Sequence, residues 1–154
     1  MKYMDAKTLD SWSENKKRQI ENPMYNKEEV AAYIKLRQKL IYECNKNGVG
    51  LLLGSDAPQV FNVPGFSIHH ELQYMVDSGL TPYQALRTGT VNVASYFKTL
   101  DGGTIKVGNA SDLVLLNGNP LADISQTRQI EGVMLGAKWL DRKYLDAELA
   151  KLVK

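Results

Sequence analysis

The chain has 154 residues and a mass of 17.2 kDa, and 44% of its residues are hydrophobic and 23% charged. This composition excludes disordered, collagen-like and disulfide-rich proteins, and the length suits one ordinary domain or slightly more. The formal net charge is +2 with both signs interspersed, so nothing calls for nucleic acid as a partner. The two histidines are adjacent and far from the single cysteine, so a histidine-rich metal site would be incomplete on this chain.

The sequence carries no signal for a membrane or for secretion. No apolar run approaches the roughly 20 residues that a membrane-spanning helix needs. Residues 1–5 lack the apolar core of a signal peptide. A single cysteine excludes an intrachain disulfide and is compatible with a reducing compartment. We therefore expect a cytoplasmic protein without membrane contact.

Helical patterns fill the first part of the chain. The basic run at residues 16–18 is interpreted as a solvated helix face or loop rather than as a phosphate contact. Asn26, with Glu29 three residues later, predicts the capped start of a long helix, and Asn47-Gly48 predicts its end. Because Cys44 lies on the apolar face of this helix, it is typical of a core residue rather than of a nucleophile. This face recurs at 3.6-residue spacing and predicts a buried stripe of Val30, Tyr33, Ile34, Leu40, Ile41 and Cys44.

A short apolar run at residues 49–53 follows this helix directly. Such a run is typical of a fully buried strand in a parallel sheet. It ends in Gly54-Ser55-Asp56-Ala57-Pro58. A carboxylate just past the C-terminal end of a buried strand lies where α/β barrels and open α/β sheets place their chemistry. Asp56 is therefore the leading site candidate; the alternative is a carboxylate that accepts local backbone hydrogen bonds in its turn.

The middle of the chain predicts three further helices. The first covers residues 68–78 and is closed by Gly79. The run Thr81-Pro82-Tyr83-Gln84 has the pattern of a capping box with proline at the first helical position. Thr90 is expected to cap the third helix, which extends through residue 97.

Strand patterns replace helical ones from residue 101 onward. A turn at residues 101–103 precedes predicted strands at residues 104–107 and 112–116. Residues 130–135 and 138–140 predict a hairpin about Gly136-Ala137, with glycine at the first central position, as a type II′ turn requires. Asp141 is expected to cap a final amphipathic helix.

His69 and His70 lie in or near the first turn of the predicted helix at residues 68–78. Adjacent helical residues point about 100° apart, so the pair is poorly placed to chelate one ion. The residues after His70 also lack the second histidine of a zincin motif. From the residues alone, an exposed pair at a helix start is the plainest interpretation.

An ordered series of motifs resembles the C-terminal part of metal-dependent amidohydrolases. Gly54-Ser55-Asp56-Ala57-Pro58 resembles the segment after the last barrel strand of that family. The resemblance is strongest to the imidazolonepropionase-like and Xaa-Pro dipeptidase-like branch, and it covers essentially the whole chain. The other matching segments, in chain order, are residues 70–72, 79–82, 84–86, 90–94, 103–108, 110–116, 119–124 and 136–140.

The resemblance implies an α/β fold that combines the last βα units of a (β/α)8 TIM barrel with the C-terminal part of a small β-sandwich. Residues 1–100 would be the C-terminal segment of the barrel, residues 101–140 the C-terminal strands of the composite sandwich, and residues 141–154 a C-terminal helix. The N-terminal barrel portion would be a missing partner. Sheet edges and helix faces that this portion would cover predict self-association, rearrangement or limited stability of the chain on its own.

The resemblance also implies roles for particular residues. Asp56 matches the family aspartate that ligates a divalent metal, expected to be zinc in the complete enzyme, and accepts a proton from the attacking water. His69 or His70 would line the substrate mouth, and Asp112 would bind backbone at a strand start. The family's His-x-His pair cannot be placed, because both histidines follow Asp56. The chain alone is therefore expected to bind catalytic metal poorly and to be inactive.

The implied activity is hydrolysis of a C–N bond in a small-molecule substrate, either a cyclic amide or a dipeptide-like compound. In this interpretation the chain is one portion of the enzyme. Two alternatives stay open. The chain could be a non-enzymatic binding or assembly module that kept pieces of the fold, or it could be one chain of a split hydrolase.

Overall fold

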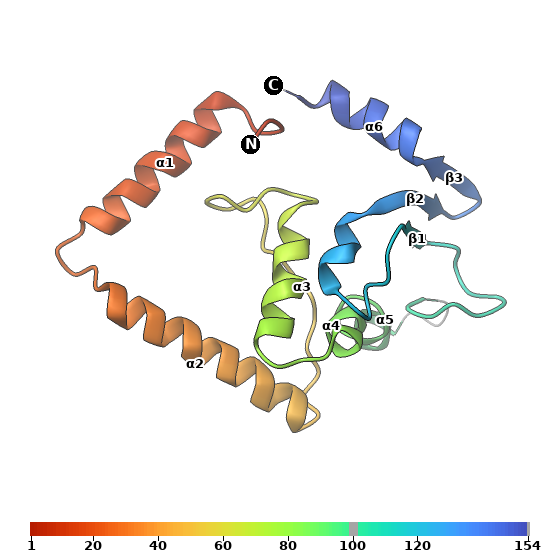
Figure 1. Ribbon diagram of the computed structural model, residues 1–154, viewed down its shortest axis with the longest axis horizontal. Helices are drawn as coiled ribbons and strands as arrows, with labels where there is room; N and C mark the ends of the chain where they lie inside the picture. Colours follow the sequence, from red (N-terminus) through yellow and green to blue (C-terminus); the bar gives the residue numbers. More distant parts are fainter. Residues whose placement is uncertain (99–101, 154) are drawn as a thin grey trace.

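The computed structural model of the chain describes residues 1–98 and 102–153. Helices come first, and a small antiparallel sheet and a terminal helix follow (Figure 1). The elements are α1 (Ala6–Glu21), α2 (Lys27–Lys46), α3 (Ser67–Asp77), α4 (Pro82–Thr88), α5 (Val91–Phe97), β1 (Leu113–Leu116), the 3-10 helix η1 (Ile124–Arg128), β2 (Ile130–Leu135), β3 (Lys138–Asp141) and α6 (Arg142–Lys151).

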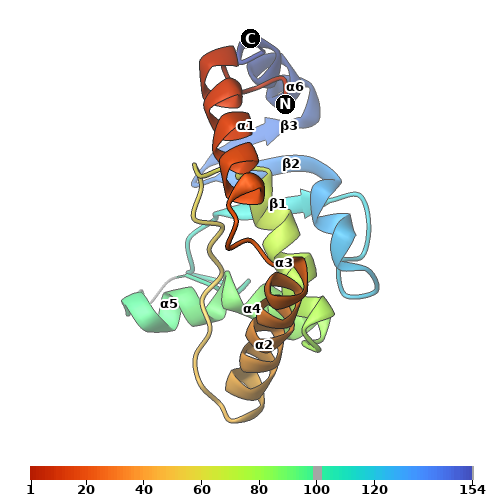
Figure 2. The same cartoon turned by 90° about the vertical axis from the view of Figure 1, so that its left-hand side faces the viewer.

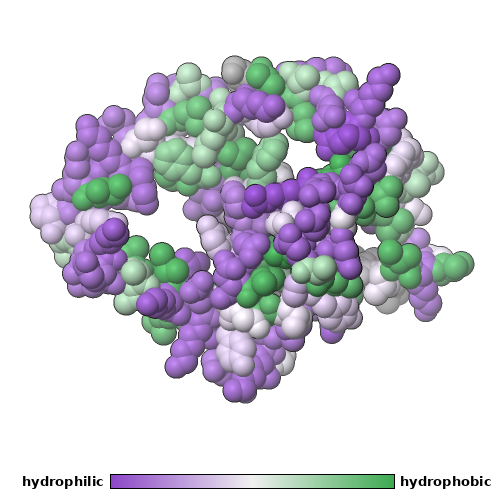
Figure 3. All heavy atoms as spheres, viewed as in Figure 1, coloured by the Kyte–Doolittle hydropathy of each residue, from purple (hydrophilic) through white to green (hydrophobic). Residues whose placement is uncertain are grey.

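The elements form a central body and an arm. Helices α1 and α2 make the arm, which curves around the outside, while α3 lies near the centre with α4 and α5 beside it (Figures 1 and 2). The sheet and α6 lie on the other side of α3 from the arm in Figure 1. A space-filling view leaves an open gap between the arm and the body (Figure 3). Among the described residues, no helix is both long and apolar enough to cross a membrane.

Helix α1 is capped at its start and held by one aromatic contact. The Asp5 carboxylate accepts a hydrogen bond from the Thr8 backbone N–H at 2.9 Å. The buried Trp12 ring meets Phe61 edge-on, with ring centroids 5.9 Å apart. The basic run at residues 16–18 is exposed on this helix, so its interpretation as a solvated helix face is confirmed.

Helix α2 begins and ends where the sequence predicts. The Asn26 side chain accepts hydrogen bonds from the backbone N–H groups of Glu28 and Glu29, at 3.0 and 3.2 Å. The Glu29 carboxylate in turn accepts a hydrogen bond from the Asn26 side-chain amide at 3.3 Å. Gly48 follows the helix with a φ of 73°, a left-handed conformation that glycine adopts without a steric penalty.

The predicted burial of the α2 apolar stripe is wrong for this chain. No residue of α2 is buried, and Tyr33, Ile34 and Leu40 are 60%, 51% and 62% exposed. Only the C-terminal end of the stripe approaches the body, where Ile41 packs against the core and Cys44 is half-buried. The stripe has helical periodicity, but the described residues place no surface against most of it.

The predicted strand at residues 49–53 is also absent. This segment is extended but belongs to no sheet in the described ranges, where the sheet contains β1, β2 and β3 alone. Two contacts attach it to the body instead: the Leu53 N–H donates to the Thr88 carbonyl at 3.1 Å, and the Asn92 side-chain amide donates to the Leu51 carbonyl at 2.9 Å. A parallel strand requires neighbouring strands, and the described residues supply none beside this segment.

Helices α3 and α4 lie where the sequence predicts, and they form the core. Gly79 closes α3 with a φ of 101°. At the start of α4, the Thr81 hydroxyl accepts from the Gln84 backbone N–H at 3.2 Å, and the Gln84 side chain accepts from the Thr81 backbone N–H at 2.8 Å. The buried apolar cluster sits between these helices and η1 and comprises Leu72, Met75, Leu80, Ala85 and Ile124.

Thr90 does not cap α5, contrary to the sequence prediction. Its hydroxyl donates to the Leu86 carbonyl at 2.9 Å, at the end of the preceding helix, and accepts no bond from the first turn of α5. The Thr90 side chain is thus directed toward the last turn of α4, and no backbone N–H of α5 bonds to it.

The predicted strand at residues 104–107 is absent as well. Thr104 lies in a bend and Val107 in a turn, and Ile105 and Val107 are 89% and 101% exposed. The alternating pattern is present, but no strand among the described residues lies beside it to accept its backbone hydrogen bonds. The preceding turn predicted at residues 101–103 begins on a residue outside the described ones.

The later strands are confirmed. The sheet order is β1-β2-β3 and both pairings are antiparallel, with Val114 opposite Val133 and Val133 opposite Leu140. Gly136 has a φ of 56° in the two-residue turn between β2 and β3, the left-handed conformation expected at the first central position. Asp112, just before β1, accepts the Gly136 backbone N–H at 2.9 Å, so its predicted structural role is confirmed.

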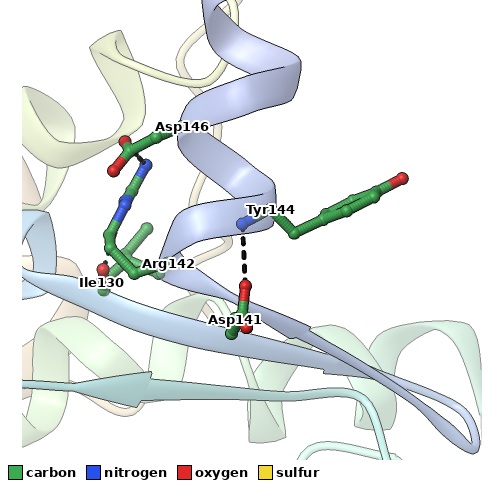
Figure 4. Close-up of polar contacts among 5 residues, drawn as sticks. All are labelled: Ile130, Asp141, Arg142, Tyr144 and Asp146. Carbon is green, nitrogen blue, oxygen red and sulfur yellow. Dashed lines mark hydrogen bonds and ion pairs between the residues drawn. The ribbon is translucent and has the colours of Figure 1, made fainter.

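Helix α6 starts at the predicted cap and is fixed to the sheet (Figure 4). The Asp141 carboxylate accepts the Tyr144 backbone N–H at 2.7 Å. The Arg142 guanidinium donates to the Ile130 carbonyl at 3.1 Å and pairs with Asp146 at 2.5 Å. One arginine therefore joins the first turn of α6 to the start of β2.

Candidate functional site

Asp56 lies in the loop between α2 and α3, just past the extended segment at residues 49–53. It is exposed and has a φ of 54°, a left-handed conformation that non-glycine residues rarely adopt. The Gln59 side-chain amide donates a hydrogen bond to one carboxylate oxygen of Asp56. The described hydrogen-bond partner of Asp56 is thus a side chain. The alternative interpretation, a carboxylate held within its turn, predicted backbone N–H groups as the partners.

The rest of this loop is held by its own polar contacts and by the N-terminal arm. The Asn62 side-chain amide donates to the Ser55 carbonyl at 3.0 Å, which ties the residue before Asp56 to the far side of the loop. Tyr3 stacks on Phe66 with ring centroids 5.0 Å apart. Together with the contact between Trp12 and Phe61, this stacking places α1 against the loop that carries Asp56.

His69 and His70 have different surroundings on α3. His69 is half-buried, and its Nδ1 lies 3.0 Å from the Thr127 hydroxyl of η1. Burial, followed by the positive charge of Arg128 and the proximity of His70, lowers the pKa of His69 below its ordinary value of 6.5. His70 is exposed. The interpretation as an exposed pair is therefore right for His70 and wrong for His69.

The described residues do not bring these candidates into one constellation. His69 lines a cleft between the helices α3–α5 and the sheet, and no residue of the loop at 51–66 lines that cleft. No group of three or more histidine, cysteine, aspartate or glutamate side chains capable of holding a metal occurs among residues 1–98 and 102–153. A catalytic metal needs several such ligands, so the donor set of these residues alone does not fit one.

Glu71 on the same helix is a further perturbed group. Its side chain is half-buried, and burial raises the pKa of Glu71 above its ordinary value of 4.5, although the Arg37 charge opposes this change. Arg37 lies on α2, so a charge on the arm affects the pKa of a carboxyl group in the body.

Sequence reasoning missed two residues at these positions. Gln59 lies three residues after Asp56, and a polar residue at that spacing in a turn was an available signal. Thr127 lies 58 residues after His69, and no local pattern connects them.

Comparisons with known proteins identify a family and several solved structures of similar fold. The amidohydrolase family model matches residues 14–140. A crystal structure of a Xaa-Pro dipeptidase with methionine bound in its active site aligns with a TM-score of 0.66 at 21% identity, over 87% of this chain and 33% of that one. Molinate hydrolase aligns with a TM-score of 0.59 at 24% identity, over 87% and 30%. An uncharacterized protein aligns with a TM-score of 0.61 at 25% identity, over 87% and 34%.

These solved structures share the fold of this chain and imply a TIM-barrel-type architecture for the family. The chain spans about a third of their length. A comparison with curated proteins finds no match. The described residues contribute α/β elements and a small three-stranded antiparallel sheet to this architecture. Because the family model covers most of the chain, the chain belongs to the amidohydrolase family.

Proposed function

We propose that the chain is the C-terminal portion of a metal-dependent amidohydrolase that hydrolyses a C–N bond in a cyclic amide or a dipeptide-like small molecule. The observation that carries this proposal is the family match at residues 14–140, in a chain that spans about a third of its structural neighbours. In this proposal residues 1–100 belong to the barrel, residues 101–140 to the composite sandwich, and residues 141–154 to a terminal helix.

The hydrogen bonding of the extended segment at residues 49–53 supports the assignment of this segment as a barrel strand. In an extended chain, alternate residues direct their backbone groups to opposite sides. The Leu51 carbonyl and the Leu53 N–H form hydrogen bonds with the body. The backbone groups of Gly50, Leu52 and Gly54 form no hydrogen bond with any residue in the described ranges. One edge is therefore free to pair with a strand from outside the described residues.

Asp56 is proposed as the catalytic carboxylate. A carboxylate near the reacting bond can accept a proton from the attacking water and return it to the leaving nitrogen. The hydrogen bond from Gln59 engages one oxygen of Asp56 and leaves the second for this task. Contact of His69 or His70 with substrate stays a prediction. The remaining metal ligands would come from the N-terminal barrel portion.

Metal content tests whether this portion is incomplete. The purified chain is incubated with zinc, dialysed and analysed for the element, beside Asp56→Ala and the control Asp112→Ala. We expect well below one retained zinc ion per chain in all three. One tightly held zinc per chain, lost in Asp56→Ala and kept in Asp112→Ala, would contradict the proposal because the chain would then hold a site of its own.

The role of Asp56 is tested in the assembled enzyme. The coding sequence upstream of Met1 is determined, and a frame that carries His-x-His, fused or separate, is co-expressed with this chain. C–N hydrolysis by the pair, lost in Asp56→Asn and kept in Asp112→Asn, is the expected result. Absence of His-x-His upstream would instead favour the binding module, and full activity of Asp56→Asn would remove Asp56 from catalysis. A separate frame would identify a split enzyme.

The exposed face of α2 supports self-association of the isolated chain. Large apolar side chains on it, such as Leu36 and Leu40, are each 62% exposed. Light scattering measures the outcome, and a strict monomer with a sharp, cooperative thermal transition would contradict this expectation.

A further inference from the structure

The cleft lined by His69 is a separate feature from the Asp56 loop. It has a volume of about 830 Å³ and lies between α4, α5 and the strand β1. This volume is in the range of small-molecule sites, which are roughly 300–1,000 Å³. Apolar side chains form most of its wall, including Leu86, Val93, Leu113, Leu116 and Ile130.

A hydrogen-bond chain fixes the proton of His69 in this wall. The Thr127 hydroxyl donates its single hydrogen to the Ile124 carbonyl at 2.9 Å. Its oxygen therefore receives the contact with His69 Nδ1, 3.0 Å away, as an acceptor. With the hydroxyl hydrogen directed to Ile124, Nδ1 carries the proton in the neutral ring and Nε2 keeps a lone pair.

Nε2 of His69 is an available acceptor. It has no hydrogen-bond partner among the described residues, and the described structure contains no buried side-chain nitrogen or oxygen without a partner. Nε2 is therefore not sealed off, and His69 borders the cleft. Asp112 also borders the cleft, but one of its oxygens accepts the Gly136 N–H.

The surroundings of His69 favour a neutral ligand. Arg128 and His70 lie near enough to lower the pKa of His69, which keeps the ring uncharged near neutral pH. The positive charge of Arg128 also disfavours a cation at this place. Apolar walls that surround one acceptor suit a molecule with an apolar body and one hydrogen-bond donor.

We infer that this cleft binds a small, neutral, ring-sized apolar molecule that donates one hydrogen bond to Nε2 of His69. The binding does not use Asp56 and goes beyond the proposed hydrolysis, although His69 is also one of the two histidines predicted to contact the substrate. Thr127 is the positioning residue, because it holds Nδ1 and so presents Nε2 as the acceptor.

Two matched probes test this inference on the full chain. Phenol carries the donor, and anisole has the same ring without it. We expect phenol to bind more tightly than anisole, on the order of fivefold, as one hydrogen bond implies. Binding is followed by NMR, with shifts expected in Leu113 and Val93 of the cleft. Long-range proton–nitrogen spectra are expected to show the proton of His69 on Nδ1.

Three variants test whether the preference for phenol depends on His69 and Thr127. His69→Leu is expected to abolish the preference for phenol, while His70→Leu, whose side chain does not line the cleft, is expected to keep it. Thr127→Val is expected to reduce the preference without removing the cleft. Any of three results would overturn the inference: equal binding of both probes to the unaltered chain, shifts centred on α2 instead of the cleft, or a proton on Nε2 of His69. If His69→Leu does not fold, the position of the His69 proton and the comparison of phenol with anisole, both measured on the unaltered chain, still test the inference.

Discussion

Helices α2 and α3 have equally clear sequence signals and opposite fates. Both have an apolar stripe and a glycine at the C-terminal end, at Gly48 and Gly79. Helix α3 buries Leu72 and Met75 in the core, whereas α2 buries none of its residues. The difference is that α3 lies against α4 and η1, while most of α2 faces open space (Figure 3). Local signals thus determine where a helix forms, and an opposing surface determines whether it contributes stability.

The contact between the two helices is confined to one end. A side chain at Gly79 would lie 2.9 Å from the Tyr42 ring of α2, so glycine permits this close approach. Beyond this point α2 diverges from the body (Figure 1). We therefore expect α2 to unfold separately from the core, in which case substitutions in the two helices have unequal effects.

The largest expected difference concerns one leucine in each helix. Leu72→Ala removes a side chain that is 5% exposed, and such substitutions cost about 2–5 kcal/mol of unfolding free energy. Leu40→Ala changes a side chain that is 62% exposed, and we expect a change within about 0.5 kcal/mol. Urea denaturation followed by circular dichroism measures both. Equal losses would mean that α2 is packed in solution, against a second copy or another surface.

Helix caps provide a smaller, more local comparison. Thr81→Ala removes the capping box of α4 inside the body, and we expect a loss of about 1 kcal/mol in global unfolding. Asn26→Ala removes the cap of α2 and is expected to fray that helix, with lower helical signal and an unchanged midpoint. Thr90→Ala is the control for N-terminal capping, because its hydroxyl bonds the Leu86 carbonyl and accepts no hydrogen bond from the start of α5. A lowered midpoint in Asn26→Ala would place α2 within the cooperative unit.

The sequence could predict what depends on near neighbours. The caps at Asn26, Thr81 and Asp141 were predictable because each hydrogen bond joins residues two or three apart. The hairpin at Gly136 was predictable for the same reason. The strands at residues 49–53 and 104–107 were not, since a strand exists only when a second segment pairs with it, and no neighbouring pattern reveals whether that segment belongs to the same chain.

The candidate site shows the same limit. Asp56 could be singled out because it lies just past an apolar run, and the structure keeps it in an exposed loop. The partner of His69 could not be predicted, because Thr127 reaches it from η1 across the junction between the helices and the sheet. The exposed or buried state of each histidine also depends on that junction.

The smallest expected effect concerns pH and the same junction. Because the pKa of His69 is lowered from 6.5 in the folded chain, the unfolded chain binds more protons when the pH falls below 6.5. Stability from His69 is therefore complete above that pH and decreases as the pH falls through the lowered pKa. The ring is half-exposed, so solvent reduces the effect. Glu71 acts in the opposite sense, since its raised pKa makes its contribution decrease as the pH rises above 4.5.

Two variants separate these contributions. Denaturation midpoints at pH 7.5 and 5.5 are expected to differ less in His69→Gln than in the unaltered chain, because glutamine does not titrate. Arg128→Gln is expected to raise the pKa of His69, measured by NMR, since it removes a positive charge that disfavours protonation. A titration midpoint of His69 at or above 6.5 would show that the ring is solvated in solution. The contact between His69 on α3 and Thr127 on η1 would then be absent in solution. The body would lack this packing contact between its helices and its sheet, and in that respect it would resemble the arm.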